Sequence, residues 1–328
     1  MKILLVIHHR LQLWNIPPSF LDRLHHDFPQ LEIVNRTTYD DIETQIRDAE
    51  ILFTLSLRAD QFRHAQKLRW IHSPAAAVHQ LLFPEIVNSE VIITNATTVH
   101  GPVVAEHVIA QLFALAKRFP QAVRLQQKHV WGQEQMWESN SHLRELAGAT
   151  LGLVGLGSIG GAVARHASAL DMRVIAVREH PEKGTPEGVH QVFATSQLET
   201  LLRRSDYVVL APPLTPQTRS LIGAPQLAQM KPDAFLINVG RGPLIDESAL
   251  IAALRENKIG GAALDVFDHE PLFSDSPLWD LENLLITPHT AGLTGKLWDR
   301  QYALLAENLH RYLNRQPLLS VIDKNRGY

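Results

Sequence analysis

Apolar runs of strand length alternate with helical segments along the N-terminal third of the chain. Five runs have the length and composition of buried strands: Ile3–Ile7, Leu31–Val34, Ile51–Leu55, Leu68–Ile71 and Val91–Thr94. Helical segments lie between them: Pro18–His26, Asp40–Arg47, Ala59–His64 and Val78–Leu82. Strands that alternate with helices are typical of a parallel sheet covered by helices. The pattern therefore predicts an α/β domain.

A second series of the same kind begins near residue 150. Its predicted strands are Leu151–Leu156, Met172–Val177, Val189–Phe193, Tyr207–Leu210, Ala234–Val239, Ala262–Val266 and Leu284–Thr287. Two long helical segments, Val99–Arg118 and Gly295–Leu313, flank the series. We expect the first to leave the N-terminal domain and lie along the second, and the other to fold back onto the first. The expected domains are thus residues 1–98 with 292–328, and residues 99–291.

A glycine-rich turn follows the first strand of this second series. Gly155, Gly157 and Gly160 form a G-x-G-x-x-G pattern, with a strand before it and a helix and another strand after it. The first glycine allows a tight turn, the second lets the backbone approach a pyrophosphate, and the third lets helix and strand pack closely. The N-terminus of the helix offers free N–H groups to the phosphates. A glycine-rich turn that binds nothing is the alternative, but the complete strand–turn–helix–strand context favours a dinucleotide site.

The end of the next strand bears on which dinucleotide is bound. An acidic residue commonly stands there and holds the ribose hydroxyls of NAD. This chain has Arg178 in that place, followed by Glu179 and His180, with Lys183 close behind. An arginine can pair with a 2′-phosphate, so Arg178 favours NADPH. Glu179, one position later, is the competing candidate for a ribose ligand and keeps NAD open.

The composition fits a soluble globular protein of two domains. The chain has 328 residues, of which 45% are hydrophobic and 20% charged, and its net charge is −3. Proteins that bind nucleic acid usually carry an excess of basic residues, and this chain has none. No apolar run approaches the length needed to cross a bilayer, and the N-terminus is expected to be a strand rather than a signal peptide. Cysteine is absent, which excludes thiol chemistry and fits a cytoplasmic location.

Polar residues accompany the ends of three later strands in the second series. Arg241 follows the first of these strands, Asp265 and Glu270 accompany the second, and His289 follows the third. Open α/β sheets bind their ligands at the carboxyl ends of the strands, so these residues are candidates for the chemistry. Taken singly, Arg241 could equally be a surface arginine in the turn before a helix capped by Asp246.

Together these segments resemble one family closely, the D-2-hydroxyacid dehydrogenases. That family carries G-x-G-x-x-G, N-x-x-R-G, D-V-F-x-x-E-P-L and T-P-H-x-A-G in this order, and the chain has GLGSIG, NVGRG, DVFDHEPL and ITPHTAG. The resemblance extends from about Asn95 to the last helix. It implies an α/β protein of two Rossmann-like doubly wound domains: a flavodoxin-like substrate domain and an inserted dinucleotide-binding domain. It further implies an oxidoreductase that moves a hydride between NADPH or NADH and a small 2-keto or D-2-hydroxy acid.

The resemblance implies a role for three residues, and each role has a physical basis. Reduction of a ketone leaves an alkoxide that needs a proton, and His289 is the acid in reduction and the base in oxidation. Glu270 is the carboxylate that favours the imidazolium. Arg241 has a planar guanidinium group that binds the substrate carboxylate and polarises the carbonyl.

The same matches imply the cofactor contacts. These are Gly155, Gly157, Ser158, Ile159, Gly160, Arg178, Pro212, Val239, Asp265, His289 and Ala291. Among them, Asp265 matches the residue that bonds the nicotinamide carboxamide. No metal site is expected.

The substrate loop of the first domain departs from the family pattern. Members usually have a glycine-containing turn and an aspartate there, whereas this chain has HSPAAAVHQ from His72. The backbone of Ala76 and Ala77 could still donate to the substrate carboxylate, beside Arg241 and His289. Ser73 and His72 could add bonds to a polar substrate or simply cap a helix, and His100 is a further candidate.

The leading interpretation is an NADPH-preferring reductase of the glyoxylate or hydroxypyruvate type. A phosphoglycerate-dehydrogenase-like enzyme is the alternative, although only Arg58 and Arg69 could supply the extra positive charge near the substrate loop. A non-catalytic dinucleotide sensor, like the family's corepressors, is an alternative of another class. Family members commonly form homodimers. The long helix around residues 101–118, with Trp131 and Trp137 after it, would supply that surface, although these aromatic residues could equally be core residues.

Overall fold

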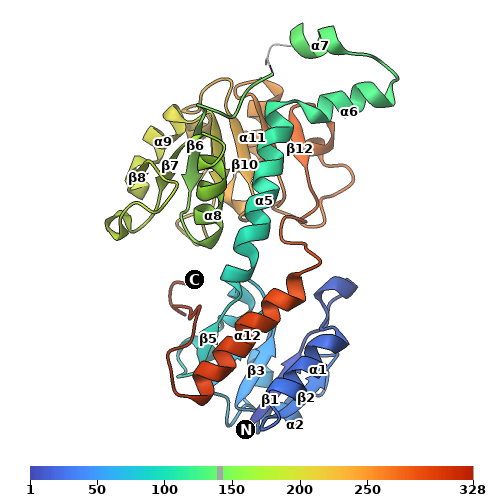
Figure 1. Ribbon diagram of the computed structural model, residues 1–328, viewed down its shortest axis with the longest axis vertical. Coiled ribbons are helices and arrows are strands. Elements are labelled where there is room, and N and C mark those ends of the chain that lie inside the picture. Colours follow the sequence, from blue (N-terminus) through green and yellow to red (C-terminus); the bar gives the residue numbers. More distant parts are fainter. Residues whose placement is uncertain (139–142, 328) are drawn as a thin grey trace. The chain divides into compact units, whose positions relative to one another are not determined.

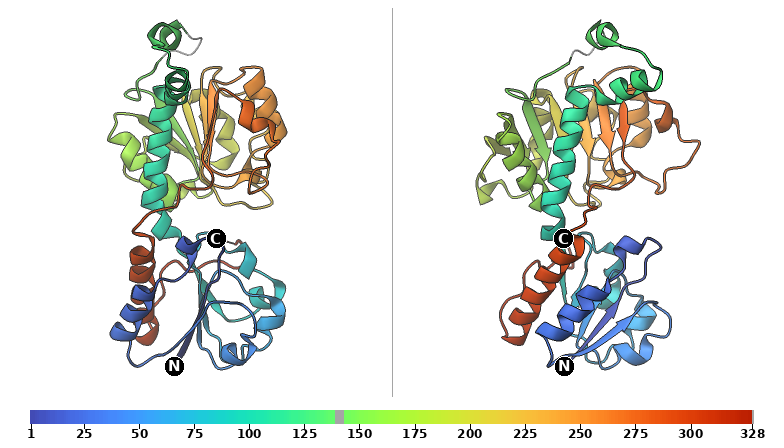
Figure 2. Two further views of the ribbon diagram at one scale, coloured as in Figure 1. Left: turned by 90° about the vertical axis from the view of Figure 1, so that its right-hand side faces the viewer. Right: turned by 45° about the vertical axis from the view of Figure 1, so that its right-hand side comes forward.

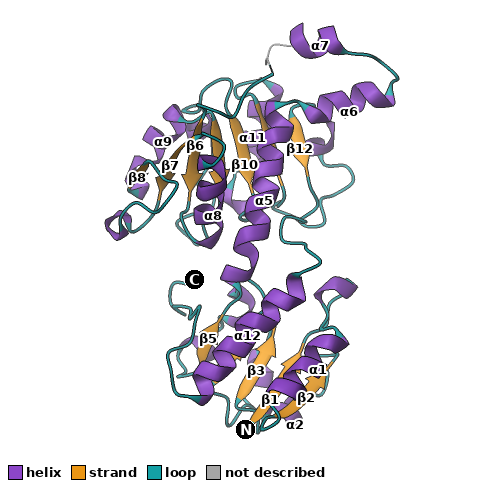
Figure 3. Cartoon of the chain, in the orientation of Figure 1, coloured by secondary structure: helices purple, strands orange, loops and turns teal. Residues whose placement is uncertain are grey.

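The computed structural model describes residues 1–138 and 143–327. The chain divides into two compact units, Met1–His100 with Thr294–Tyr328 (unit 1), and Gly101–Leu293 (unit 2) (Figure 1). The division falls after residue 100, where the sequence suggested 98, and after residue 293, where it suggested 291. Each unit is a parallel sheet between layers of helices (Figure 3).

Unit 1 is built on five parallel strands in the order β2-β1-β3-β4-β5. The strands are β1 (Lys2–Val6), β2 (Glu32–Arg36), β3 (Ile51–Thr54), β4 (Trp70–His72) and β5 (Ile92–Thr94). The helices are α1 (Pro18–Asp27), α2 (Glu43–Ile46), α3 (Ala59–Phe62), α4 (Pro84–Val87) and α12 (Leu297–Leu313). This strand order is that of a flavodoxin-like sheet.

Alternate residues of β1 show how the two cores of unit 1 form. Ile3 and Leu5 are buried in the cluster that includes side chains of α1 and α12, and Leu4 and Val6 are buried in the cluster on the other face. Successive strand residues point to opposite faces of a sheet, so a continuous apolar run produces a sheet that is buried on both sides. Figure 2 shows α1 and α12 together on one side of the sheet.

Unit 2 is built on seven parallel strands in the order β12-β11-β10-β9-β6-β7-β8. The strands are β6 (Thr150–Val154), β7 (Arg173–Val177), β8 (Gln191–Phe193), β9 (Tyr207–Leu210), β10 (Phe235–Asn238), β11 (Gly261–Leu264) and β12 (Leu284–Ile286). The order runs outward in both directions from β6. This is the Rossmann-like doubly wound arrangement, and its topological switch point lies between β6 and β9.

The helices of unit 2 cover both faces of this sheet. They are α5 (Thr97–Ala116), which starts in unit 1, α6 (Phe119–Gln127), α7 (Gln133–Glu138), α8 (Ser158–Ser168), α9 (Leu198–Arg204), α10 (Ala224–Leu227) and α11 (Glu247–Arg255). Buried residues of α5 and α8 pack with Tyr207 and Val209 of β9, whereas those of α9 and α11 pack with Val208 and Leu210. α6 and α7 extend away from the sheet (Figure 1).

α5 corrects one expectation from the sequence. By length and composition alone, this helix is long and apolar enough to cross a membrane, whereas the sequence was expected to contain no such segment. However, 56% of the most apolar window is buried inside the protein. Val104, Val108 and Leu112 lie in the core of unit 2. The apolar character of α5 is thus that of a core helix.

The predicted fold class is confirmed, since both parallel doubly wound sheets are present and all twelve predicted strands are found within two residues of their expected ends. Four predicted helices are shorter than expected. Ala59–His64 ends at Phe62, and Gly295–Leu313 begins at Leu297. Asp40–Arg47 is helical only from Glu43, because Asp41 has a left-handed backbone with φ of 53°. Val78–Leu82 reduces to a single 3-10 turn at His79–Leu81.

Candidate active site

The register of the seven-stranded sheet aligns the carboxyl ends of six strands. The last paired residues are neighbours in one line across the sheet: Val154, Val177, Leu210, Asn238, Leu264 and Ile286. The residues that follow them therefore share one edge: Gly155, Arg178, Ala211, Val239, Asp265 and Thr287. Segments far apart in the sequence are brought together here, at the edge where open α/β sheets bind ligands.

The glycine turn after β6 has the geometry that a pyrophosphate requires. Gly155 has φ of +94°, and a Cβ there would lie 2.8 Å from the backbone nitrogen of Pro212. A Cβ on Gly160 would lie 2.2 Å from the carbonyl oxygen of Gly155, so only glycine lets α8 pack on the turn. A Cβ on Gly157 would meet no protein atom within 4 Å. The first and third glycines are thus required by packing, and the second faces open space at the N-terminus of α8.

The first turn of α8 completes this cradle. Ser158 and Ile159 begin the helix, and their backbone N–H groups have no acceptor within the described ranges. Free N–H groups at a helix N-terminus bind phosphate. The residues present therefore fit a dinucleotide pyrophosphate.

Arg178 stands at the end of β7 with its guanidinium available. Its backbone N–H donates to the carbonyl oxygen of Phe193 at 3.1 Å, which fixes the main chain. The side chain is partly exposed and makes no ion pair with any residue that the structure describes. Nearby, Nδ1 of His180 lies 3.0 Å from a carboxylate oxygen of Glu182. The competing candidate, Glu179, is exposed.

The turn after β10 is held by a buried asparagine and carries Arg241. Nδ2 of Asn238 donates to the carbonyl oxygen of Arg241 at 2.9 Å, and Oδ1 accepts the N–H of Gly240 at 3.0 Å. Nη1 of Arg241 donates to the carbonyl oxygen of Gly240 at 2.6 Å. Burial lowers the pKa of Arg241 and the charge of Glu270 opposes this effect, but the guanidinium stays cationic. The other N–H groups of the Arg241 guanidinium have no partner among the described residues.

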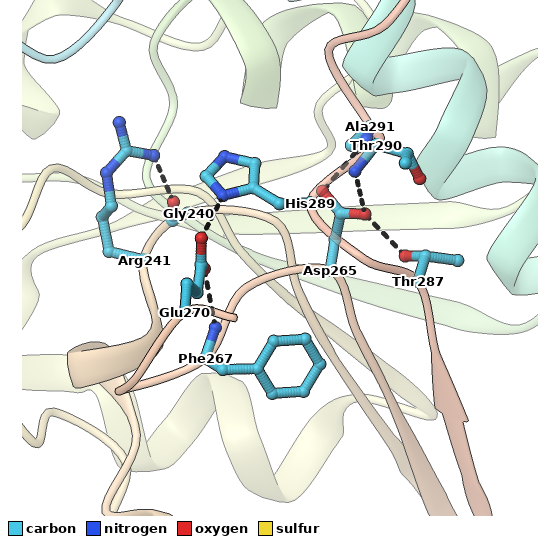
Figure 4. A network of polar contacts seen from close by, with 9 residues as sticks. All are labelled: Gly240, Arg241, Asp265, Phe267, Glu270, Thr287, His289, Thr290 and Ala291. Carbon is cyan, nitrogen blue, oxygen red and sulfur yellow. Dashed lines mark hydrogen bonds and ion pairs between the residues drawn. The ribbon is translucent and has the colours of Figure 1, made fainter. Parts of the chain in front are cut away.

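His289 and Glu270 form a hydrogen-bonded pair at the ends of β12 and β11 (Figure 4). Nδ1 of His289 lies 2.5 Å from Oε2 of Glu270, and Oε1 of Glu270 accepts the N–H of Phe267 at 3.0 Å. The backbone of His289 is left-handed, with φ of 53°, and its N–H donates to the carbonyl oxygen of Asp265 at 2.9 Å. Such a backbone is uncommon for a residue other than glycine and is typical of functional sites.

This geometry fixes which nitrogen of His289 can act on a ligand. Nδ1 is occupied by Glu270, whereas Nε2 has no protein partner in the described part of the chain. The imidazole is about half exposed, at 49%. Nε2 is therefore the atom that can exchange a proton with a substrate.

Glu270 remains ionised in this setting. Burial by itself would raise the pKa of Glu270. The hydrogen bonds from His289 and from the Phe267 N–H lower it, as does the charge of Arg241, and together they outweigh burial. The net effect is a pKa below the ordinary value for glutamate. The carboxylate can thus serve as a fixed negative charge beside the imidazole.

The other predicted cofactor residues also lie along this edge. Asp265 is buried, at 1% exposed, and accepts the N–H of Ala291 at 3.0 Å. Pro212 adjoins Gly155, as the close approach above shows. The side chain of Val239 is buried in the core of unit 2, and its N–H donates to the carbonyl oxygen of Leu210 at 3.3 Å. Only its carbonyl group has no partner among the described residues.

The substrate loop of unit 1 presents its N–H groups without a glycine. Three successive carbonyl groups of the loop accept hydrogen bonds. The carbonyl oxygen of Pro74 accepts a bond from Nε2 of Gln301 at 2.6 Å. That of Ala75 accepts the N–H of Ala96 at 3.1 Å, and that of Ala76 accepts a bond from Nδ2 of Asn95 at 2.7 Å. The N–H groups of Ala76 and Ala77 have no acceptor among the described residues. No residue of the loop has a positive φ, which explains why alanines can stand where a glycine was expected.

Three side chains near this loop point elsewhere. His72 and Ser73 are fully buried at 0% exposed, so the structure does not bring them to a surface where they could contact a substrate. Nδ1 of His72 lies 2.7 Å from the hydroxyl of Thr94 in the core. Nε2 of His100, also buried, lies 3.4 Å from the carbonyl oxygen of Pro74. These residues support the loop from within.

Two residues that received no role from the sequence adjoin Asp265. The hydroxyl of Thr287 donates to Oδ1 of Asp265, and Nε2 of His107 lies close to both. Thr287 belongs to the T-P-H segment, so its place in that motif could have indicated a role at the site. No sequence pattern indicates a role for His107, because it lies on α5, 180 positions from Thr287. Within the described ranges, no group of His, Asp and Glu side chains is arranged to hold a metal ion.

Comparisons with known proteins agree with this site. Residues 109–291 match the NAD-binding domain of the D-isomer specific 2-hydroxyacid dehydrogenases. The glyoxylate reductase of Korarchaeum cryptofilum is 37% identical over 273 residues, which are 81% of this chain and 80% of that protein. The D-3-phosphoglycerate dehydrogenase of Methanocaldococcus jannaschii is 32% identical over 297 residues, 90% of this chain but only 55% of that protein.

A solved structure extends the likeness to the whole chain. The NADPH-dependent glyoxylate/hydroxypyruvate reductase of Sinorhizobium meliloti, solved with NADP and sulfate, has a TM-score of 0.83 and 26% identity, and the match covers both chains completely. The resemblance seen in the sequence motifs is confirmed. The chain belongs to the D-isomer specific 2-hydroxyacid dehydrogenases, oxidoreductases that depend on NAD(P) and act on the CH–OH group of 2-hydroxy acids.

Proposed function

We propose that this enzyme reduces a small 2-keto acid of the glyoxylate or hydroxypyruvate type with NADPH. The observation that carries the proposal is the His289–Glu270 pair at the same sheet edge as Arg241 and the glycine turn. The pair provides a proton donor, the arginine provides a carboxylate ligand, and the turn provides a phosphate cradle. These are the parts that reduction of a keto acid needs.

The roles of the residues follow from their free atoms. The nicotinamide, when bound, supplies the hydride. The open donors of Arg241 bind the substrate carboxylate and polarise its carbonyl group. Nε2 of His289 gives a proton to the oxygen that becomes the alkoxide, and Glu270 stabilises the imidazolium before that step. In oxidation the same nitrogen removes the proton.

The preference for NADPH rests on Arg178. Its guanidinium is available at the end of β7, and a partly exposed arginine there can form charged hydrogen bonds to a 2′-phosphate. Lys183 adds positive charge nearby. The Sinorhizobium meliloti relative, whose structure was solved with NADP, supports the same preference.

A phosphoglycerate-dehydrogenase-like activity is the second candidate, favoured by the 32% identity to the Methanocaldococcus jannaschii enzyme. A phosphorylated substrate needs more positive charge than a simple keto acid. Arg58 is already paired with Asp60, with Nε 3.1 Å from Oδ1, which weakens this candidate.

One experiment distinguishes these activities. Steady-state rates are measured with NADPH and NADH for glyoxylate, hydroxypyruvate, pyruvate, bulkier keto acids and, in the oxidative direction, 3-phosphoglycerate. We expect the highest kcat/KM with NADPH and glyoxylate or hydroxypyruvate. Turnover confined to 3-phosphoglycerate would favour the second candidate, and tight dinucleotide binding without turnover would favour a sensor.

We further propose that the enzyme is a homodimer that uses α6, α7 and the segment between them. Phe119, Val123 and Trp131 are exposed there, with Trp131 at 91% and Phe119 at 54%. A group of large apolar side chains exposed together is typical of a protein interface. Trp137, at 67% exposed, extends the same surface.

A further inference from the structure

Asp265 is a buried carboxylate whose hydrogen bonds leave one site open. Oδ1 accepts the Thr287 hydroxyl at 2.6 Å and the Thr290 N–H at 2.9 Å, and Oδ2 accepts the Ala291 N–H at 3.0 Å (Figure 4). A carboxylate has about four lone-pair sites, two on each oxygen. The protein therefore occupies both sites of Oδ1 and one of Oδ2. No donor among the described residues occupies the second site of Oδ2.

The direction of the hydrogen bonds at Thr287 follows from the chemistry of its neighbours. A hydroxyl has one proton, and that proton goes to Asp265, because an ionised carboxylate only accepts. The Thr287 oxygen also lies 3.1 Å from Nε2 of His107 and accepts Nε2 of Gln111 at 3.4 Å. Because the only hydroxyl proton is already used, His107 must be the donor. Nε2 of His107 therefore carries a hydrogen.

His107 can provide this hydrogen without being charged. Burial lowers the pKa of His107, and the charge of Asp265, whose Oδ1 lies 3.6 Å from Nε2, opposes this only in part. The neutral tautomer with hydrogen on Nε2 still donates to Thr287. The result is a chain of donors, from His107 to Thr287 to Asp265, that joins α5 to the ends of β11 and β12.

We propose that His107 and Thr287 are positioning residues for the nicotinamide half of the cofactor. They hold the Asp265 carboxylate in one orientation, so that the open site on Oδ2 would be available to a carboxamide N–H of the nicotinamide. The inference rests on the proposed function and on the role that the family motifs imply for Asp265, a bond to that carboxamide. His107 and Thr287 act through Asp265 and do not themselves touch the cofactor.

The consequence is control over which face of the nicotinamide reacts. The ring can turn over about its bond to the ribose, and the two orientations present opposite hydrogens at C4. A carboxamide that is held by a fixed carboxylate allows only one of them. If Asp265 is free to rotate, both orientations are populated. The phosphates are bound separately, at Gly157 and the start of α8, so their affinity is not affected.

The experiment compares variants that differ by one donor. Thr287→Val removes the hydroxyl at constant shape, and Thr287→Ser keeps it. His107→Leu removes the ring donor, and His107→Gln keeps an amide N–H at the same number of bonds from the backbone. Ser205→Ala is the matched control, because it removes a different buried hydroxyl of unit 2, which donates to the carbonyl oxygen of Leu201 at 2.7 Å.

Two readouts separate positioning from general damage. The first is the Kd of NADPH beside that of 2′-phospho-ADP-ribose, which has the same phosphates but no nicotinamide. The second is the share of deuterium transferred from each face of NADPH labelled at C4. We expect Thr287→Val and His107→Leu to weaken NADPH roughly tenfold, as expected for loss of a hydrogen bond to a charged group. Binding of the fragment stays unchanged and transfer from the minor face rises. Thr287→Ser and His107→Gln restore both readouts.

Equal weakening of NADPH and of the fragment, or unchanged binding with unchanged facial selectivity, overturns the inference. The Ser205→Ala control should alter neither ratio. If the wild type prefers NADH, the same comparison with ADP-ribose applies. A wild type without keto-acid turnover contradicts the proposed function, and the two binding constants then still decide the positioning role.

Discussion

Oε2 of Glu270 and Nδ1 of His289 lie 2.5 Å apart, and the second oxygen of the carboxylate is held by the Phe267 N–H. The glutamate therefore has one orientation and orients the imidazole in turn. Since Nδ1 is occupied, Nε2 is left for the substrate. In the proposed function, this pair performs the proton transfer, whereas the glycine turn and Arg178 serve the cofactor.

Replacing Glu270 with glutamine should lower kcat for reduction roughly 10–100-fold, as expected when a charged hydrogen bond becomes a neutral one. The kcat–pH profile should also change, because glutamine does not supply the negative charge that Glu270 keeps beside the imidazole. Glu247→Gln is the control, since this partly buried carboxylate of α11 lies outside the proposed pair. An unchanged profile in the Glu270 variant would show that the pair does not set the protonation of the catalytic acid.

Arg241→Lys should raise the KM for the keto acid by about tenfold or more and also lower kcat, because an ammonium cannot bind a carboxylate through two parallel bonds. The Kd of NADPH should stay within about twofold of wild type, since Arg241 is assigned to the substrate. Arg255→Lys, at the exposed end of α11, is the matched control. A variant with wild-type KM but weak NADPH binding would move Arg241 from the substrate to the cofactor.

Arg178→Asp should shift the ratio of kcat/KM for NADPH over NADH towards NADH by roughly 10–100-fold, the worth of a charged hydrogen bond to phosphate. Arg173→Asp introduces the same change at the other end of β7 and should leave the ratio unaltered. If the ratio does not move in Arg178→Asp, then Glu179 or another residue determines the choice of cofactor.

His72 should make unit 1 sensitive to acid. Burial lowers the pKa of His72 to about 3, whereas an unfolded histidine has a pKa of about 6.5. Between these values the unfolded state binds more protons than the folded state, so stability is retained above pH 6.5 and falls as the pH decreases towards 3. The loss should approach about 1.4 kcal/mol per pH unit from this group.

This loss can be measured by urea unfolding followed through the fluorescence of Trp70, which packs beside His72. Between pH 6 and 4.5, His72→Phe should show a smaller decrease in the free energy of unfolding than wild type. The exposed His64→Phe should behave as wild type. Equal slopes in all three proteins would mean that His72 does not contribute to the acid sensitivity.

Trp131→Ser should convert the proposed dimer to a monomer, because the change removes the most exposed large apolar side chain of that surface. Light scattering over a range of concentrations measures the mass. Trp279→Ser is the control, as this tryptophan is also exposed, at 49%, but belongs to the 3-10 helix at Pro277–Asp280. A wild-type protein that is monomeric at every concentration would refute the proposed interface.

Much of the fold and of the proposed site could be predicted from local sequence. The apolar runs gave the strands, because each parallel strand is buried on both faces, as the alternation within β9 illustrates. The polar residues after β10, β11 and β12 could be grouped, because the ends of parallel strands meet at one edge. Arg241, Glu270 and His289 were found in this way.

Contacts between distant elements were beyond prediction. The bond between His107 and Thr287 depends on how α5 packs on the sheet, and no local pattern encodes it. The conformation of the Pro74–Ala77 loop depends on Gln301, which lies 227 positions from Pro74. The burial of His72 was likewise not evident, since a histidine at a strand end is compatible with either the core or a site.

The most direct test of the account is the turnover of His289→Ala with the best keto acid and NADPH. We predict that kcat falls by roughly 10²–10⁴, the usual contribution of general acid–base catalysis, while the Kd of NADPH changes little. Turnover close to that of wild type with any 2-keto acid would contradict the assignment of His289 as the proton donor.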